Sequence, residues 1–317
     1  MLPRCCHCRR CLFVACHYVL SVCVPQWNPV ASCFFALEDY IHSRNGSKET
    51  TAQNPFLKGG WAPAREERDS FHLQFEGQIP EALHGGLFLR NGPSPQHDPA
   101  ARYHMFDGDG MVQSVFFEGM QQASSSTHIV QTPRVQAELH AGRPLWIKVG
   151  DMTGMSGLIK LLALEPLKEK LGIMPKLSEV EKGQANTAFL KICGRLFAVF
   201  EASLPFELGL RKTTSPDGSA TGVQLMSLGY ERFGRLKHPM SAHPKVDIRT
   251  GEAYFFGYDL KCAEGEPFML HSVVSPEGVI SRTTPMELPE KVMVHDFALT
   301  AGYSVILDLP LQVSTCK

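Results

Sequence analysis

Two histidines in this 317-residue sequence stand in contexts that suit metal binding. His243 precedes Pro244, which favours an extended backbone, and no acidic residue adjoins it to satisfy the ring locally. His295 follows the apolar run 292–294, so its imidazole is expected at the edge of a buried strand. Neutral imidazole is a common metal ligand. The alternative is that each histidine is an ordinary hydrogen-bonded side chain of the core or the surface.

The spacing of the two histidines favours one architecture. His243 and His295 lie 52 residues apart. A four-stranded propeller blade takes about 40–45 residues, so the spacing could bring both rings to equivalent positions on successive blades, facing a central channel. The residues alone leave this interpretation open beside the ordinary one.

The acidic turn Asp-Gly-Asp-Gly-Met at residues 107–111 is a second candidate for chemistry. As a calcium loop it has carboxylates at positions one, three and twelve, but Met111 and Val112 occupy positions that require an oxygen ligand and a glycine. It also lacks the third glycine of a dinucleotide-binding loop. The sequence therefore predicts a structural turn, in which the glycines adopt positive φ and the aspartates accept hydrogen bonds from local amides.

Other chemistries lack their usual motifs. The sequence has no Gly-x-Ser-x-Gly elbow, no Walker loop and no His-Glu-x-x-His helix. Its 31 basic and 32 acidic residues give a formal net charge of −1, which provides no field to hold a phosphate backbone. We therefore expect no nucleic-acid partner.

The elements that must position these residues are mainly short strands. Apolar runs separated by glycine- and proline-rich turns predict strands, and no alternation of strand and helix appears. The predicted strands are 71–75, 87–90, 112–117, 190–192, 196–200, 254–258, 268–274 and 292–294. Leucines at three- and four-residue steps over 155–173 predict one kinked helix or two short helices around Pro166. The prediction is an all-β, mostly antiparallel domain with a helical insertion, either a propeller or a sandwich.

The N-terminal region differs from the rest of the chain. Seven of the 10 cysteines precede residue 34, and basic residues are followed by an apolar run from Leu12 to Val24, too short to span a bilayer. We expect residues 1–53 to be a leader or a disordered segment, and residues 54–317 to be the folded domain. The leader fits a plastid or a secretory address. The cysteine-poor body favours an intracellular domain.

Two alternatives concern this N-terminal region. Cys5, Cys8 and Cys11 could suggest zinc, but no second pair of ligands follows at the usual spacing. A cysteine-rich secreted binding module would instead predict disulfides and a glycan at Asn45, which begins an Asn-Gly-Ser triplet.

Several segments, in order along residues 54–311, resemble the signature segments of the carotenoid cleavage oxygenase family. They are Arg90-Asn91-Gly92-Pro93, the stretch 103–111, Ala185-Asn186-Thr187, Ala242-His243-Pro244-Lys245, Thr250-Gly251-Glu252 and His295-Asp296-Phe297-Ala298-Leu299-Thr300. The stretch 150–172 looks most like plant enzymes that cleave carotenoids at the 9,10 double bonds.

The resemblance implies a seven-bladed β-propeller with a helical dome and an iron(II) ion held by four histidines. It assigns His243 as the first ligand and His295 as the second. In the family, glutamates support the ligand rings, and Glu201 matches the first of them. Such a carboxylate can orient the free N–H of a metal-bound imidazole. The alternative for Glu201 is a solvated acid at a strand end.

The implied reaction uses Fe2+ and O2 to cleave a conjugated double bond of a carotenoid or apocarotenoid into two carbonyl products. An apolar tunnel would select the bond. The stretch 158–171 would belong to the dome and to an apolar patch that contacts a membrane, or else it packs on the core. The compartment suggested is the plastid or the cytoplasm.

Two departures from the family pattern stand out. Gln113 replaces a histidine that is common in the family but is not one of the four ligands. The sequence reaches Lys317 without third and fourth ligands, so we expect an incomplete, C-terminally truncated propeller that is inactive by itself. The alternatives are a non-catalytic carotenoid-binding propeller remnant and a family member that acts on another polyene or on a stilbene.

Overall fold

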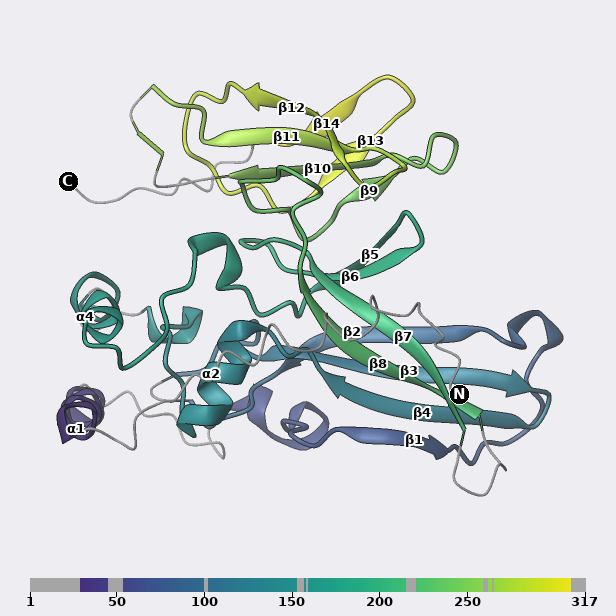
Figure 1. Cartoon of the computed structure of the whole chain (residues 1–317), viewed down its shortest axis with the longest axis horizontal. Helices are drawn as coiled ribbons and strands as arrows, with labels where there is room; N and C mark the ends of the chain where they lie inside the picture. Colours follow the sequence, from purple (N-terminus) through teal and green to yellow (C-terminus); the bar gives the residue numbers. More distant parts are fainter. Residues whose placement is uncertain are drawn as a thin grey trace, which may run out of the picture.

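The computed structural model describes residues 29–44, 54–99, 102–152, 157, 159–214, 221–258, 262–263 and 265–308 (Figure 1). The cysteine-rich stretch, the apolar run from Leu12 to Val24 and the triplet at Asn45 lie outside these residues, so the interpretations made for them stay predictions.

The described residues form three four-stranded antiparallel sheets and one two-stranded sheet. The first sheet has the order β1 (Arg68–His72), β4 (Gln122–Ile129), β3 (Asp109–Gly119) and β2 (Leu87–Ser94). The second has the order β5 (Ala188–Ile192), β6 (Arg195–Val199), β7 (Phe206–Thr214) and β8 (Thr221–Tyr230). The third has the order β12 (Ile280–Met286), β11 (Met269–Val274), β10 (Ala253–Tyr258) and β9 (Lys245–Val246), and β13 (Phe297–Leu299) pairs with β14 (Ser304–Ile306). The all-β, antiparallel prediction is confirmed.

Local sequence explains the hairpins. Cys193 and Gly194 between β5 and β6 have φ values of 46° and 72°, the pair of positive values that matches the twist of two adjacent strands. Most predicted strands are found within a few residues of their expected bounds.

The strand predicted at residues 292–294 is wrong. Val292 and Val294 are buried and Met293 points outward, as in a strand, but only Val292 forms a bridge and the segment is not assigned as a strand. Alternating burial arises here from packing on the third sheet, and within the described residues no strand pairs along the segment.

The sheets pack on one another in chain order. Phe197 and Leu190 of the second sheet share a core with Phe255 and Val274 of the third. A second core joins Val112 of the first sheet to β7 and β8. Successive sheets therefore form one continuous stack, shown from bottom to top in Figure 1.

The helices gather on one side of the sheets (Figure 1). They are α1 (Pro29–Arg44), α2 (Pro133–Ala141), the π-helical turn η5 (Lys160–Leu164) and α4 (Glu165–Lys170). Short 3-10 turns are η1 (Pro55–Leu57), η2 (Gly59–Trp61), η3 (Glu81–Leu83), η4 (Val149–Asp151) and η6 (Glu179–Glu181). Helix is confirmed at 160–170, where η5 runs into α4. Pro166 lies just after the junction of η5 and α4, inside a continuous helical segment, and the π-helical turn comes directly before it.

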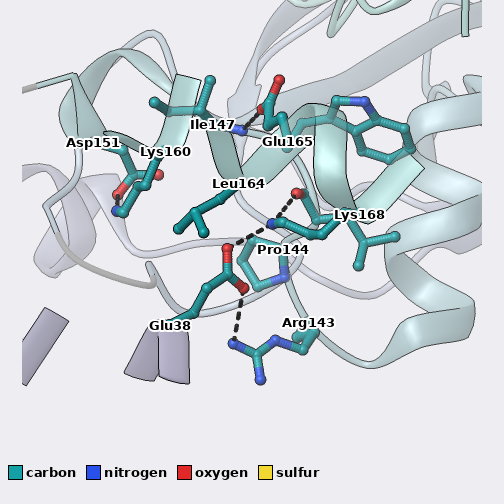
Figure 2. A pocket seen from close by; sticks show the side chains of 11 residues that line it. Glu38, Arg143, Pro144, Ile147, Asp151, Lys160, Leu164, Glu165 and Lys168 are labelled. Carbon is teal, nitrogen blue, oxygen red and sulfur yellow. Dashed lines mark hydrogen bonds and ion pairs between the residues drawn. The ribbon is translucent and has the colours of Figure 1, made fainter. Parts of the chain in front are cut away.

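Helix α1 falls within the segment predicted as a leader. Ala31 packs in a cluster with Leu145, Trp146 and Met174. Figure 2 shows that Glu38 of α1 reaches Lys168 of α4, with 2.6 Å between Oε1 and Nζ. Lys168 also donates to the Leu145 carbonyl oxygen at 2.8 Å. Both side chains are nearly fully buried, so the attraction between the two charges must compensate each of them for its lost hydration.

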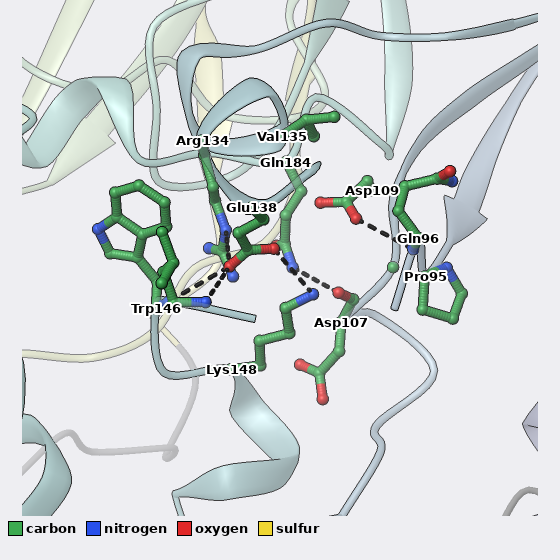
Figure 3. A network of polar contacts seen from close by, with 12 residues as sticks. Pro95, Gln96, Asp107, Asp109, Arg134, Val135, Glu138, Trp146, Lys148 and Gln184 are labelled. Atoms are coloured by element: carbon green, nitrogen blue, oxygen red, sulfur yellow. Dashed lines mark hydrogen bonds and ion pairs between the residues drawn. The ribbon is translucent and has the colours of Figure 1, made fainter. Parts of the chain in front are cut away.

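A second buried network holds α2 against the loop that follows it (Figure 3). Glu138 accepts hydrogen bonds from the backbone N–H groups of Leu145 and Trp146, at 3.0 and 3.2 Å. Burial alone would raise the pKa of Glu138, but Lys148 and Arg134 outweigh it and hold that pKa below its ordinary value. The carboxylate therefore stays charged and fixes the loop.

The prediction of positive φ at the acidic turn is wrong, because Gly108 and Gly110 have no positive φ. Close packing requires these glycines: a Cβ on Gly108 would lie 2.5 Å from the Ser94 nitrogen, and one on Gly110 would lie 2.4 Å from the Ala185 oxygen. Asp107 accepts from one local amide, His104, and from the distant amides of residues 149 and 150. The segment is a packing junction at the start of β3.

Candidate metal centre

The structure brings His243 and His295 side by side. Their Nε2 atoms lie 3.0 Å apart, and their ring centroids lie 4.5 Å apart with the planes at 76°. His243 lies two residues before β9 and His295 two residues before β13. Folding of the third sheet and the strand pair that follows it therefore joins two residues that are distant in the sequence.

Buried neighbours fix the backbone on both sides of each ring. Ala242 is fully buried, and the Ser241 N–H donates to the Phe256 carbonyl oxygen of β10 at 2.7 Å. Val294 and Phe297 pack on the same strand from the other segment. The apolar neighbours anchor both loops on β10, so the imidazoles can project outward; the His295 side chain is 66% exposed.

Glu201 lies beside the second ring. It follows β6, and its Oε2 lies 3.1 Å from His295 Nδ1 with the side chain 14% exposed. Burial raises the pKa of Glu201 to about 8; Asp296 adds to the rise, and the Ala242 N–H opposes it. With a pKa of about 8 the group is mostly protonated at neutral pH, and a cation bound nearby would favour its ionised form. An ionised Glu201 could accept from Nδ1–H and leave the Nε2 lone pair free, which is the state a metal ligand needs.

The spacing of the two nitrogens fits one divalent cation. Imidazole nitrogens bind such ions at about 2.1 Å, so two ligands at a right angle lie about 3.0 Å apart. The measured Nε2 separation is 3.0 Å. Among the residues that the structure describes, no group of three or more His, Cys, Asp or Glu side chains is placed to hold a metal. The described residues thus bring two imidazole nitrogens together.

Sequence reasoning missed an ion pair beside the rings. Lys245 Nζ lies 2.7 Å from Asp296 Oδ1, and these residues stand directly in the two histidine motifs. Their opposite charges, two residues after His243 and one residue after His295, are the only sign in the sequence. His238, by contrast, is a core histidine whose ring contacts the Pro239 carbonyl and the Ser272 hydroxyl at 2.7 and 2.8 Å.

The stretch 158–171, which was expected to form an apolar patch, has both buried and exposed apolar side chains. Leu164 is buried, whereas Ile159, Leu162, Leu167 and Leu171 are exposed. The packed-helix alternative therefore holds for one leucine and surface exposure for its neighbours. In the part of the chain that the structure covers, no helix is long and apolar enough to cross a membrane.

Comparison with known proteins shows which protein family the chain resembles. A family model described as retinal pigment epithelial membrane protein (RPE65) matches residues 61–317. The carotenoid 9,10(9′,10′)-cleavage dioxygenase 1 of Arabidopsis thaliana is 35% identical over 258 residues, covering 81% of this chain and 45% of that protein. A chloroplastic 9-cis-epoxycarotenoid dioxygenase of the same plant, NCED6, is 33% identical over 256 residues, covering 80% and 41%.

The solved structures agree with the sequence relatives. The lignostilbene dioxygenase of Pseudomonas brassicacearum superposes with a TM-score of 0.60 at 29% identity, covering 78% of this chain and 46% of that one. All three relatives are dioxygenases, which sets the class. The chain belongs to the RPE65 family of carotenoid cleavage oxygenases, and it spans a little under half the length of these relatives.

Proposed function

We propose that this chain forms part of a non-haem iron(II) dioxygenase that cleaves a conjugated double bond of a carotenoid or apocarotenoid into two carbonyl products. The observation that carries the proposal is the 3.0 Å approach of His243 and His295, at the positions where the family resemblance puts ligands. Names of relatives that cleave carotenoids support the substrate class.

Each residue of the centre has a distinct task. Iron(II), when bound, supplies the chemistry that joins dioxygen to the carbons of the double bond. His243 and His295 offer neutral nitrogen lone pairs, and Glu201 holds the Nδ1–H of His295 so that its ring keeps its orientation. None of them needs to act as a nucleophile, which accounts for the missing hydrolase motifs.

The fold would provide the axis of a propeller. We infer that the three four-stranded sheets are successive blades of a seven-bladed propeller and that the helices belong to its dome; their packing in chain order supports this. Two nitrogens bind a cation more weakly than four. The 317-residue chain alone is therefore expected to hold iron weakly and to cleave little.

The exposed leucines of η5 and α4 would contact a membrane that contains the apolar substrate. A plastid location is favoured over the cytoplasm by the chloroplastic relative. The double bond that is cut would depend on the apolar tunnel that the family resemblance implies.

Iron binding tests the proposal. The chain is mixed anaerobically with Fe2+, and bound iron is measured against free iron for the parent and for His243→Ala and His295→Ala. Losing one of two ligands is expected to weaken binding about tenfold or more. His140→Ala, at an exposed position of α2, is the control. Unchanged iron binding in both ligand variants would refute the proposal.

One alternative has a specific observation in its favour. The described residues offer two ligands only, which suits a carotenoid-binding remnant without catalysis. Incubation with β-carotene or an apocarotenal separates the two: stoichiometric pigment binding without products favours the remnant. Strong cleavage by this chain would contradict its expected inactivity. Product mass spectrometry with a stilbene tests the substrate of the solved relative.

A further inference from the structure

We propose that the Lys245–Asp296 ion pair sets the spacing of His243 and His295 and thereby their capacity to hold one divalent cation. This inference rests on the proposed function for its metal, but the positioning of the rings can be measured without one. Lys245 and Asp296 are positioning residues, since they act through the histidines.

The ion pair links the two histidine motifs directly. Lys245 stands two residues after His243, Asp296 follows His295, and Nζ lies 2.7 Å from Oδ1. The intervening Pro244 has a fixed φ, so movement of Lys245 is transmitted to His243 with little slack. The bond thus joins the two loops beside the point where their Nε2 atoms meet.

Both ends of the ion pair are held in place by the fold. Lys245 belongs to β9, where it pairs with Tyr254 of β10, and its ammonium lies 5.8 Å from the Phe297 ring centroid. Asp296 Oδ1 accepts the Phe297 backbone N–H at 2.7 Å, which fixes its rotamer. Two anchored ends make a stiff link, because little side-chain freedom remains to be lost when the bond forms.

Contacts with β10 hold the two loops, and the Lys245–Asp296 ion pair then sets the distance between the two rings. The loop before β9 contacts Phe256 through the hydrogen bond from the Ser241 N–H to the Phe256 carbonyl oxygen. The loop before β13 contacts it through the Phe297 ring, whose centroid lies 5.8 Å from that of the Phe256 ring. These contacts involve the buried residues Phe256 and Phe297, whereas the ion pair joins partly exposed side chains, as does the contact of His295 with Glu201.

Charge adds a second effect in the same direction. A lone ammonium beside the rings would repel a cation, and Asp296 neutralises it. Removing Asp296 therefore both loosens the loops and exposes a positive charge. Removing Lys245 loosens the loops but leaves a negative charge, so the two single variants separate spacing from charge.

The exposure of the ion pair indicates that it contributes little to stability. Lys245 and Asp296 are 33% and 51% exposed, and ion pairs this open contribute about 0–1 kcal/mol to stability. We therefore expect the melting temperature to change by less than about 4 °C in either variant. A merely structural role would show in melting and not in the site.

Cobalt(II) provides the probe, because its visible absorption reports its ligands. The 317-residue chain, Lys245→Met, Asp296→Asn and the exchanged double variant Lys245→Asp with Asp296→Lys are titrated with Co2+. Asp296→Asn is expected to raise the Co2+ dissociation constant about fivefold, less than loss of a partner bonded directly to a ligand ring. Lys245→Met is expected to raise it only about twofold, because the remaining carboxylate attracts the cation. The double variant is expected to recover most of the loss.

Arg249→Met is the matched control. It breaks the Arg249–Asp247 ion pair, of 2.8 Å, in the turn that follows β9, and it is expected to bind Co2+ like the parent. Single variants that match this control, or an exchanged variant that recovers nothing, would overturn the inference.

Metal-free protein separates this inference from the proposed function. Ring resonances of ¹⁵N-labelled histidine report the approach of His243 to His295 and are expected to shift in Lys245→Met and Asp296→Asn but not in Arg249→Met. Unshifted resonances overturn the inference. Shifted resonances in a chain whose Co2+ binding ignores His243→Ala and His295→Ala uphold ring positioning and reject the metal function.

Discussion

At the scale of single residues, the centre depends on the partners of the two ring nitrogens of His295. His295 meets Glu201 through Nδ1 at 3.1 Å and His243 through Nε2 at 3.0 Å. In the proposed centre, an ionised Glu201 would favour the proton on Nδ1 and so direct the Nε2 lone pair towards His243. A buried acid with its pKa raised to about 8 has few partners of its own and gains most from a cation nearby.

Replacing Glu201 by glutamine tests this role. Glu201→Gln keeps the shape but removes the charge and adds an N–H donor, so we expect Co2+ to bind about tenfold more weakly. Glu277→Gln, on the exposed turn between β11 and β12, is the control. Equal Co2+ affinity in the parent and both variants would show that the carboxylate does not support the ring.

At the scale of elements, the helical side is held by buried charges as well as by apolar packing. Lys168 of α4 receives Glu38 from α1 and the Leu145 carbonyl from the loop after α2. One cation therefore ties three segments that are far apart in sequence (Figure 2). Removing one partner leaves a buried charge without compensation, which costs more than the pair contributes.

Unpairing Lys168 is predicted to destabilise the chain more than removing the pair. Glu38→Gln leaves a buried ammonium and is expected to cost about 3 kcal/mol, whereas Glu38→Gln with Lys168→Met should recover part of the loss. Denaturant unfolding measures both. Arg65→Met, which breaks an exposed ion pair with Asp98, should cost under about 1 kcal/mol. An equal effect of Glu38→Gln and Arg65→Met would argue against the anchoring of α1.

At the scale of the whole molecule, the centre lies where the second and third sheets meet. Glu201 follows β6 of the second sheet, while both histidines flank the third. The shared core of these sheets includes Phe197, whose ring packs edge-on against Phe233 at 5.2 Å between centroids. The distance from Glu201 to His295 therefore depends on sheet packing.

Truncating Phe197 tests this dependence. Phe197→Ala empties a fully buried site and is expected to cost about 3–5 kcal/mol on denaturant unfolding, with weaker Co2+ binding. Phe88→Ala, at an exposed position of β2, should cost under about 0.5 kcal/mol and leave Co2+ binding unchanged. Destabilisation without any change in Co2+ affinity would show that the centre is independent of this junction.

Local pattern and family resemblance are properties of the chain, and they were enough to predict the strands with strong apolar runs, the helix around Pro166 and the candidates His243, His295 and Glu201. The tertiary structure was needed to show that the rings meet at 3.0 Å and that Lys245 contacts Asp296. It also showed that 292–294 forms no ladder with another strand among the described residues and that Gly108 serves close packing without positive φ. Each of these depends on which distant backbone comes alongside, and no local pattern encodes that partner.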